Sequence, residues 1–155
     1  PHLRIEHRAM PAGPSIPDLI ANAALYYGLV RALAQATPSV PATLPFAMSR
    51  ANFYAAARDG LRAEIVWLNG RRASLQQLLR EELLPLARRG LRALEIDAAD
   101  ADEYLGIVAA RVDSGRTGSD WQRRFLARHG PDLNELTLAY LERQRNGRPV
   151  HEWAD

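Results

Sequence analysis

The chain has 155 residues, 47% of them hydrophobic, and no cysteine. This is enough for one domain with a hydrophobic core, and the missing cysteines exclude disulfides and thiolate metal sites, so we expect a cytoplasmic protein. Its 20 basic residues are interleaved with 18 acidic ones, and no apolar run approaches the length of a membrane-spanning helix. We therefore expect no nucleic-acid partner and no membrane partner.

The first segment, His2 to Ala9, alternates apolar and charged residues, which is the period-two pattern of a β-strand. One face of this strand carries Leu3, Ile5 and His7. The other face carries Arg4, Glu6 and Arg8. Because a lone strand has no partner for its backbone groups, we expect the rest of the sheet to lie upstream, on polypeptide that precedes this chain.

A proline-rich turn follows, and residues 10–155 are expected to be mainly helical. One stretch in this range also fits a short hairpin. A helix is expected over Asp18–Ala36, and because it is apolar around most of its circumference it should be buried. Gly28 within it should allow close packing. The expected fold is mainly α, an α+β fragment with one N-terminal strand followed by about six helices.

The middle of the chain carries a second helix and the possible hairpin. Ser49 is expected to cap the helix, and Gly60 is expected to end it. The stretch Leu61–Ser74 is typical of a short hairpin, in which Asn69 and Gly70 would supply a tight turn.

The second half of the chain is expected to be helical apart from the loop SGRTGS and the irregular tail RPVHEWAD. Ser74 and Gln77 have capping-box spacing at the start of a leucine-rich helix, which Pro85 should kink or divide. Acidic residues introduce a further helix over Asp97–Val112. The last two helices are expected to begin at Ser119 and Asp132.

The Arg4, Glu6 and Arg8 face is the main candidate for chemistry. Side chains two apart on a strand lie roughly 6 to 7 Å from each other. A carboxylate between two guanidiniums stays ionised and is a good ligand for Mg²⁺, while guanidiniums can clamp phosphate or carboxylate groups. The same pattern also fits a solvent-exposed strand of ion pairs that contributes little energy. Spacing alone leaves both interpretations open.

A resemblance bears on this choice. The stretch LRIEHRAMPAGPSIPDLIANAALYYGLVRAL resembles the Arg-x-Glu-x-Arg strand, proline turn and apolar helix of the glutamine synthetase-like superfamily. Within that superfamily the chain is most similar to the carboxylate-amine ligases called glutamate–cysteine ligase-like. The stretches ANFYAAARDGLRAEI, LQQLLREELLPLARRGL, TGSDWQ and GRPVHEW extend the similarity. The resemblance implies the C-terminal part of the catalytic fold of a longer enzyme, with residues 1–9 as its catalytic strand.

The resemblance also implies roles for single residues. Glu6 would bind one of the divalent ions, Mg²⁺ or Mn²⁺, that bridge the phosphates of ATP. Arg4 would meet the nucleotide phosphates, and Arg8 the substrate carboxylate or its acyl-phosphate form. In the family reaction ATP phosphorylates a carboxylate, glutamate or a similar acid, and an amine then displaces phosphate to leave an amide. The run AMPAGPSIPD replaces the Asp and Ser-Ala-Asn-Pro residues of glutamine synthetase itself, which leaves the amine and the role of Arg8 open.

Asn52 and Arg58 also match the family, as residues that would lie behind the catalytic ones and position them. Six positions apart on a helix, they do not share a narrow face, and a capping amide with a surface arginine is an equal alternative. We expect the isolated chain to be inactive without the upstream part of the enzyme, and its apolar helical surface can serve homo-oligomer contacts. The alternative function is a non-catalytic helical binding or regulatory module.

Overall fold

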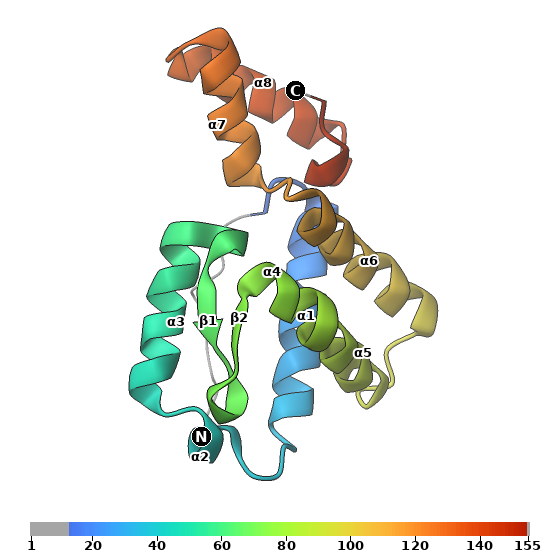
Figure 1. Cartoon of the computed structure of the whole chain (residues 1–155). Helices are drawn as coiled ribbons and strands as arrows, with labels where there is room; N and C mark the ends of the chain where they lie inside the picture. The colour runs from blue at the N-terminus through green and yellow to red at the C-terminus, as the bar shows by residue number, and fades with distance from the viewer. Residues whose placement is uncertain (1–12, 155) are drawn as a thin grey trace, which may run out of the picture.

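The computed structural model describes residues 13–154 and shows a mainly α-helical fold with one small antiparallel sheet (Figure 1). Six helices in this range have nine or more residues, in agreement with the sequence-based expectation. The expected strand His2–Ala9 lies outside the described residues. Within residues 13–154 no helix combines the length and apolar character needed to cross a membrane.

Helix α1 (Ile16–Leu33) is the centre of the main helical layer. Ser15 caps it and Pro17 occupies its first turn, a position where the missing N–H of proline costs nothing, so the helix starts two residues before the expected Asp18. It ends at Leu33, before the expected Ala36. It packs against α5 (Leu84–Arg92) and α6 (Ala98–Ser114). Gly28 allows this close packing, because a Cβ there would overlap the backbone of Ala87.

Two helices and a short turn follow α1: α2 (Val40–Thr43), α3 (Phe46–Asp59) and η1 (Gly60–Arg62). The prediction that Ser49 caps α3 is wrong, because the helix already begins at Phe46 and the Ser49 N–H donates to the Pro45 carbonyl at 3.1 Å. Extended backbone at Pro45 lets the helix start directly after it. Gly60 ends α3 with φ of 58°, as expected.

The hairpin is present and pairs β1 (Glu64–Val66) with β2 (Arg72–Ser74). Ile65 faces Ala73 in the register, and both side chains are buried. Asn69 and Gly70 lie in the turn as expected, but the connection is longer than two residues and contains the 3₁₀ turn η2 (Leu68–Gly70). The register explains the difference, because its last pair, Val66 with Arg72, leaves five residues to connect.

The leucine-rich segment after the hairpin is divided as expected. The Ser74 hydroxyl accepts the Gln77 N–H at 3.2 Å and starts α4 (Leu75–Leu78). A single π-helical segment, η3 (Leu79–Leu83), then leads into α5, whose second residue is Pro85. Proline has no N–H for the regular hydrogen bond four residues back, so the helix widens before it.

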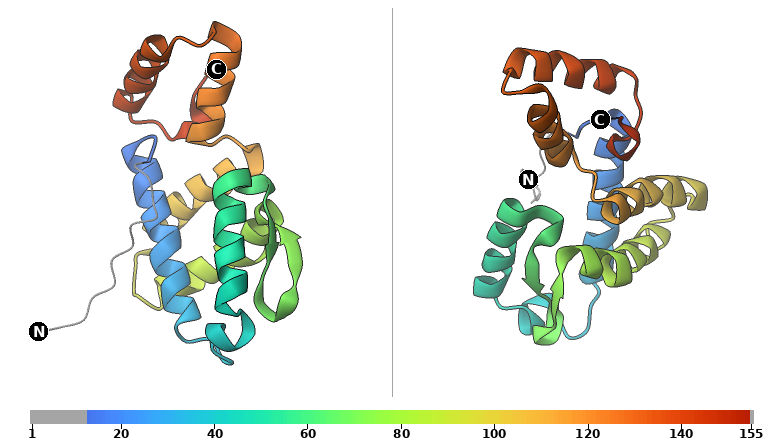
Figure 2. Two further views of the ribbon diagram at one scale, coloured as in Figure 1. Left: turned by 90° about the vertical axis from the view of Figure 1, so that its left-hand side faces the viewer. Right: turned by 45° about the horizontal axis from the view of Figure 1, so that its top comes forward.

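Helices α7 (Gly118–His129) and α8 (Leu133–Arg145) form a pair at one end of the molecule, away from α2 and the hairpin loop (Figures 1 and 2). Helices α6 and α8 start where acidic residues are expected to introduce them, and Asp97 and Asp132 are their caps. Thr117, rather than Ser119, caps α7, since its hydroxyl accepts the Asp120 N–H at 3.2 Å. The tail turns back as η4 (Val150–Glu152), and its Trp153 packs against Trp121.

Candidate functional site

The residues expected to carry the chemistry are Arg4, Glu6 and Arg8, and all three lie outside the described residues. The description starts at Gly13, and α1 begins three residues later at Ile16. The N-terminal end of α1 is therefore the described helix end nearest in sequence to the expected site.

That helix end contains a buried polar pair. Ser15 is 2% exposed and Asp18 is 0% exposed. The Ser15 hydroxyl accepts the Asp18 N–H at 3.3 Å and donates to Asp18 Oδ2 at 2.8 Å. The spacing Ser-x-x-Asp places a hydroxyl on the first free N–H groups of the helix and a negative charge in its first turn. These contacts hold the end of the proline-rich turn against α1.

Asp18 also joins two distant parts of the chain to α1. The backbone N–H of Val150, in η4, donates to Asp18 Oδ2 at 2.8 Å. Arg111 Nη1, from α6, lies 3.6 Å from Asp18 Oδ1. The other amino group of Arg111, Nη2, donates to Asn22 Oδ1 at 2.8 Å. One buried carboxylate therefore fixes α1, α6 and the C-terminal tail relative to one another.

The electrostatics of this junction are those of a buried ion pair. Burial lowers the pKa of Arg111, and the nearby Asp18 carboxylate opposes that change. Burial also raises the pKa of Tyr140 on α8, with Asp18 adding to the increase and a hydrogen bond from Gln122 opposing it. A carboxylate enclosed in this way has a structural task, since 0% exposure leaves it no room to meet a substrate.

Asn52 and Arg58 lie on α3 in different surroundings. The Asn52 amide donates from Nδ2 to the Val66 carbonyl at 2.7 Å and accepts the Val66 N–H on Oδ1 at 3.0 Å. It thus ties β1 to α3. Arg58 is exposed and pairs with its neighbour Asp59 at 2.8 Å. A role for either residue in positioning the catalytic groups stays a prediction.

Arg58 borders a hollow of about 260 Å³ between the end of α3 and the start of α7. Its lining carries both signs of charge, with Arg62 and Arg123 as well as Asp59 and Asp120. The N–H groups at the start of α7 are partly used by its own cap, Thr117. The hollow therefore offers no concentrated positive charge for a phosphate.

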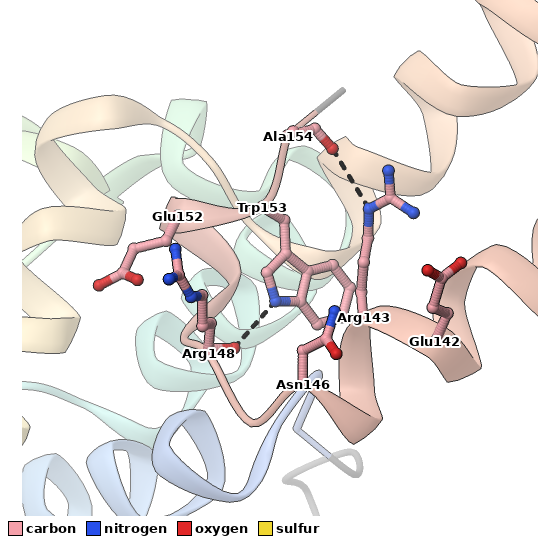
Figure 3. A pocket seen from close by; sticks show the side chains of 7 residues that line it. All are labelled: Glu142, Arg143, Asn146, Arg148, Glu152, Trp153 and Ala154. Atoms are coloured by element: carbon pink, nitrogen blue, oxygen red, sulfur yellow. Dashed lines mark hydrogen bonds between the residues drawn. The ribbon is translucent and has the colours of Figure 1, made fainter.

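A larger and more open hollow of about 630 Å³ lies between α8 and the tail (Figure 3). Trp153 Nε1 donates to the Arg148 carbonyl at 2.8 Å, and Arg143 Nε donates to the Ala154 carbonyl at 3.3 Å. These bonds attach the tail to α8. The wall carries both arginines and glutamates, so its charges are mixed. The residues that line it are Glu142, Arg143, Asn146, Arg148, Glu152, Trp153 and Ala154.

The described residues do not form a metal centre by themselves. Across residues 13–154 no three histidine, aspartate or glutamate side chains are grouped so that they could hold an ion. The expected ligand, Glu6, supplies the hard oxygen atoms that Mg²⁺ prefers, but it lies outside this range. A fit to Mg²⁺ therefore rests on the donor chemistry of the first segment.

The junction at Asp18 is not predicted from the sequence, in which Asp18 marks only the expected start of a helix and Arg111 has no expected role. Two signals are present: the Ser-x-x-Asp spacing, and a single acidic residue in a largely apolar helix. The partners, 93 positions or more away, have no local signal.

The comparison with family models defines the class of protein. The model of the glutamate-cysteine ligase family 2 (GCS2) matches residues 1–143, nearly the whole chain. The chain belongs to this family, which indicates a carboxylate-amine ligase. No curated protein and no solved structure matches it significantly.

Proposed function

We propose that this chain is part of an ATP-dependent carboxylate-amine ligase, which joins the carboxylate of glutamate or a similar acid to an amine. The observation that supports the proposal is the family match over residues 1–143, because this range includes the Arg4, Glu6 and Arg8 segment. Glutamate-cysteine ligases generally use ATP and Mg²⁺, and Mn²⁺ has the same preference for oxygen ligands. We propose the cytoplasm as its location.

In this proposal the three polar residues of the first segment have separate tasks. Glu6 donates carboxylate oxygens to one divalent ion, Arg4 pairs with nucleotide phosphates, and Arg8 holds the substrate carboxylate. Guanidinium groups suit both anions because their N–H groups form paired hydrogen bonds. ATP supplies the activation that makes the carboxylate reactive toward the amine. The contribution of these residues is positioning and charge neutralisation.

The proposal includes a second polypeptide segment. One carboxylate, Glu6, does not suffice for two ions and a nucleotide, so the remaining ligands belong to further strands of the same enzyme. The 155-residue chain alone is then expected to show no ligase turnover. Substantial amide formation by the isolated chain would contradict this part of the proposal.

The decisive experiment compares two glutamate substitutions in the complete ligase. Glu6→Gln keeps the size of the side chain and removes its charge, and we expect turnover to fall by about 100-fold or more if a metal ligand is lost. Glu64→Gln, on the exposed position of β1, is the matched control and should retain turnover. The assay measures amide product by mass spectrometry with ATP, Mg²⁺, glutamate and a panel of amines.

Circular dichroism of Glu6→Gln checks that the fold is intact. A folded Glu6→Gln protein with unchanged amide formation would contradict the assignment and favour the alternative, a helical binding or regulatory module. Replacement of Mg²⁺ by Mn²⁺ in the same assay tests whether the ion contacts hard oxygen ligands, which both ions accept.

A further inference from the structure

Helix α1 exposes an unbroken apolar stripe. Its members are Ile16, Leu19, Ile20, Tyr27 and Val30, of which Ile16 is 67% exposed and Tyr27 is 60% exposed. The opposite side of the helix, with Ala21 and Gly28, is buried against α5 and α6. The apolar stripe is therefore the side of α1 that no described element covers.

The spacing of these residues shows that they form one surface. At 100° per residue they lie within an arc of about 100°, which Ala23 completes. None of the six residues carries a charge. The solvent face of a helix in a globular protein is normally polar, so an apolar arc of this width indicates a contact with another apolar surface.

The chain before α1 indicates what that surface is. The segment His2–Ala9, expected as a strand with Leu3 and Ile5 on one face, joins α1 through only six residues, 10–15. A strand of eight residues is about 26 Å long and an 18-residue helix is about 27 Å long, so the two elements match in length. A connection this short places a helix against the sheet that contains the preceding strand.

A single strand is too narrow to cover the stripe. Neighbouring strands are about 4.8 Å apart, whereas a helix with its side chains is about 10 Å across, so at least two strands are needed. We propose that the apolar stripe of α1 packs against the apolar face of a β-sheet that contains His2–Ala9. The remaining strands come from the further segment of the ligase. Their origin rests on the proposed function, whereas the packing of α1 on the sheet does not.

The 155 residues contain no cysteine, so single introduced cysteines can be labelled once any cysteine in the further segment has been replaced by serine. Single cysteines are introduced as Ile20→Cys and Tyr27→Cys in the stripe, and as Leu138→Cys on α8, a matched control because Leu138 is 68% exposed. In the complete ligase, maleimide labelling of the stripe cysteines should be about tenfold or more slower than that of the control, because buried thiols react only after local opening. Equal rates at all three positions would overturn the proposal.

A cross-link identifies the covering element. The pair Ile5→Cys and Tyr27→Cys should be joined within one chain by a short bismaleimide, whereas Ile5→Cys and Leu138→Cys should not. A cross-link only between two chains, or protection that disappears on dilution, would show a second copy on the stripe and overturn the proposal. Circular dichroism confirms that each variant is folded.

These measurements do not depend on turnover. Protected stripe cysteines in a protein without ligase activity would contradict the proposed function and leave the packing intact. Exposed stripe cysteines in an active ligase would overturn the packing proposal and leave the proposed function intact. The two proposals can therefore fail separately.

Discussion

Asp18 and Arg111 form an ion pair at 3.6 Å between α1 and α6, and the carboxylate is completely buried. The same carboxylate accepts the Val150 N–H, so one side chain joins the start of α1 to the C-terminal tail. Removal of such a charge leaves its partner buried without compensation, which costs more than the loss of a surface ion pair.

Asp18→Asn should therefore lower the free energy of unfolding by about 3 kcal/mol. Urea denaturation followed by circular dichroism measures the change. The control is Asp113→Asn, which breaks the exposed pair with Arg80 and should cost less than about 1 kcal/mol. Similar losses of unfolding free energy in the two variants would contradict the structural role of Asp18.

Tyr140 should make stability depend on alkaline pH. Burial and the Asp18 charge raise the pKa of this tyrosine in the folded state, so the folded protein holds the phenolic proton more tightly than the unfolded chain. This contribution is fully present below the ordinary tyrosine pKa of about 10 and is lost as the pH rises through the higher folded value. Urea midpoints at rising pH should fall less steeply above pH ~10 for Tyr140→Phe than for the parent protein. Tyr54→Phe, at an exposed ring, is the control.

The contact between α1 and α5 should tolerate no side chain at two glycines. A Cβ on Gly28 would overlap the backbone of Ala87, and a Cβ on Gly90 would overlap the carbonyl of Gly28. Gly28→Ala should lower the free energy of unfolding by about 2 kcal/mol, because the two backbones must separate. Gly106→Ala on α6, where a Cβ meets no atom, should instead raise it by about 0.5–1 kcal/mol. Thermal unfolding of both variants measures the contrast.

Asn52 and Arg58 should differ sharply when each is replaced by alanine. Asn52→Ala leaves the N–H and carbonyl of Val66 without their partner and should cost about 2 kcal/mol, with faster hydrogen exchange at Val66. Arg58→Ala removes an exposed pair and should leave the urea midpoint nearly unchanged. A large loss of ligase turnover in folded Arg58→Ala would support its predicted positioning role; unchanged turnover would contradict it.

Local signals in the sequence predicted several features of the fold correctly. Ser74, Asp97 and Asp132 cap the helices that follow them, and Gly60 ends α3. Pro85 interrupts its helix because the missing N–H acts wherever the residue stands in the fold. These features depend on bonds between residues a few positions apart, which the sequence displays directly.

The errors occurred where two local signals competed. Ser49 and Ser119 are both good caps, yet Pro45 and Thr117 precede them and the helices start there. Asn69 and Gly70 favour a tight turn, but the register of β1 with β2 requires a longer connection. Packing of the flanking elements decides between such signals, since each alone is worth only about 1 kcal/mol.

The sequence by itself determined the family, the mainly helical fold, and the Arg4, Glu6 and Arg8 segment as the candidate site, because these depend on residue types and short spacings. Only the tertiary structure decided that Asp18 meets Arg111 and Val150, that Gly28 meets Ala87 and Gly90, and that none of residues 13–154 covers one side of α1. Such contacts join residues far apart along the chain. They follow from how the helices pack, and no short stretch of sequence contains both partners.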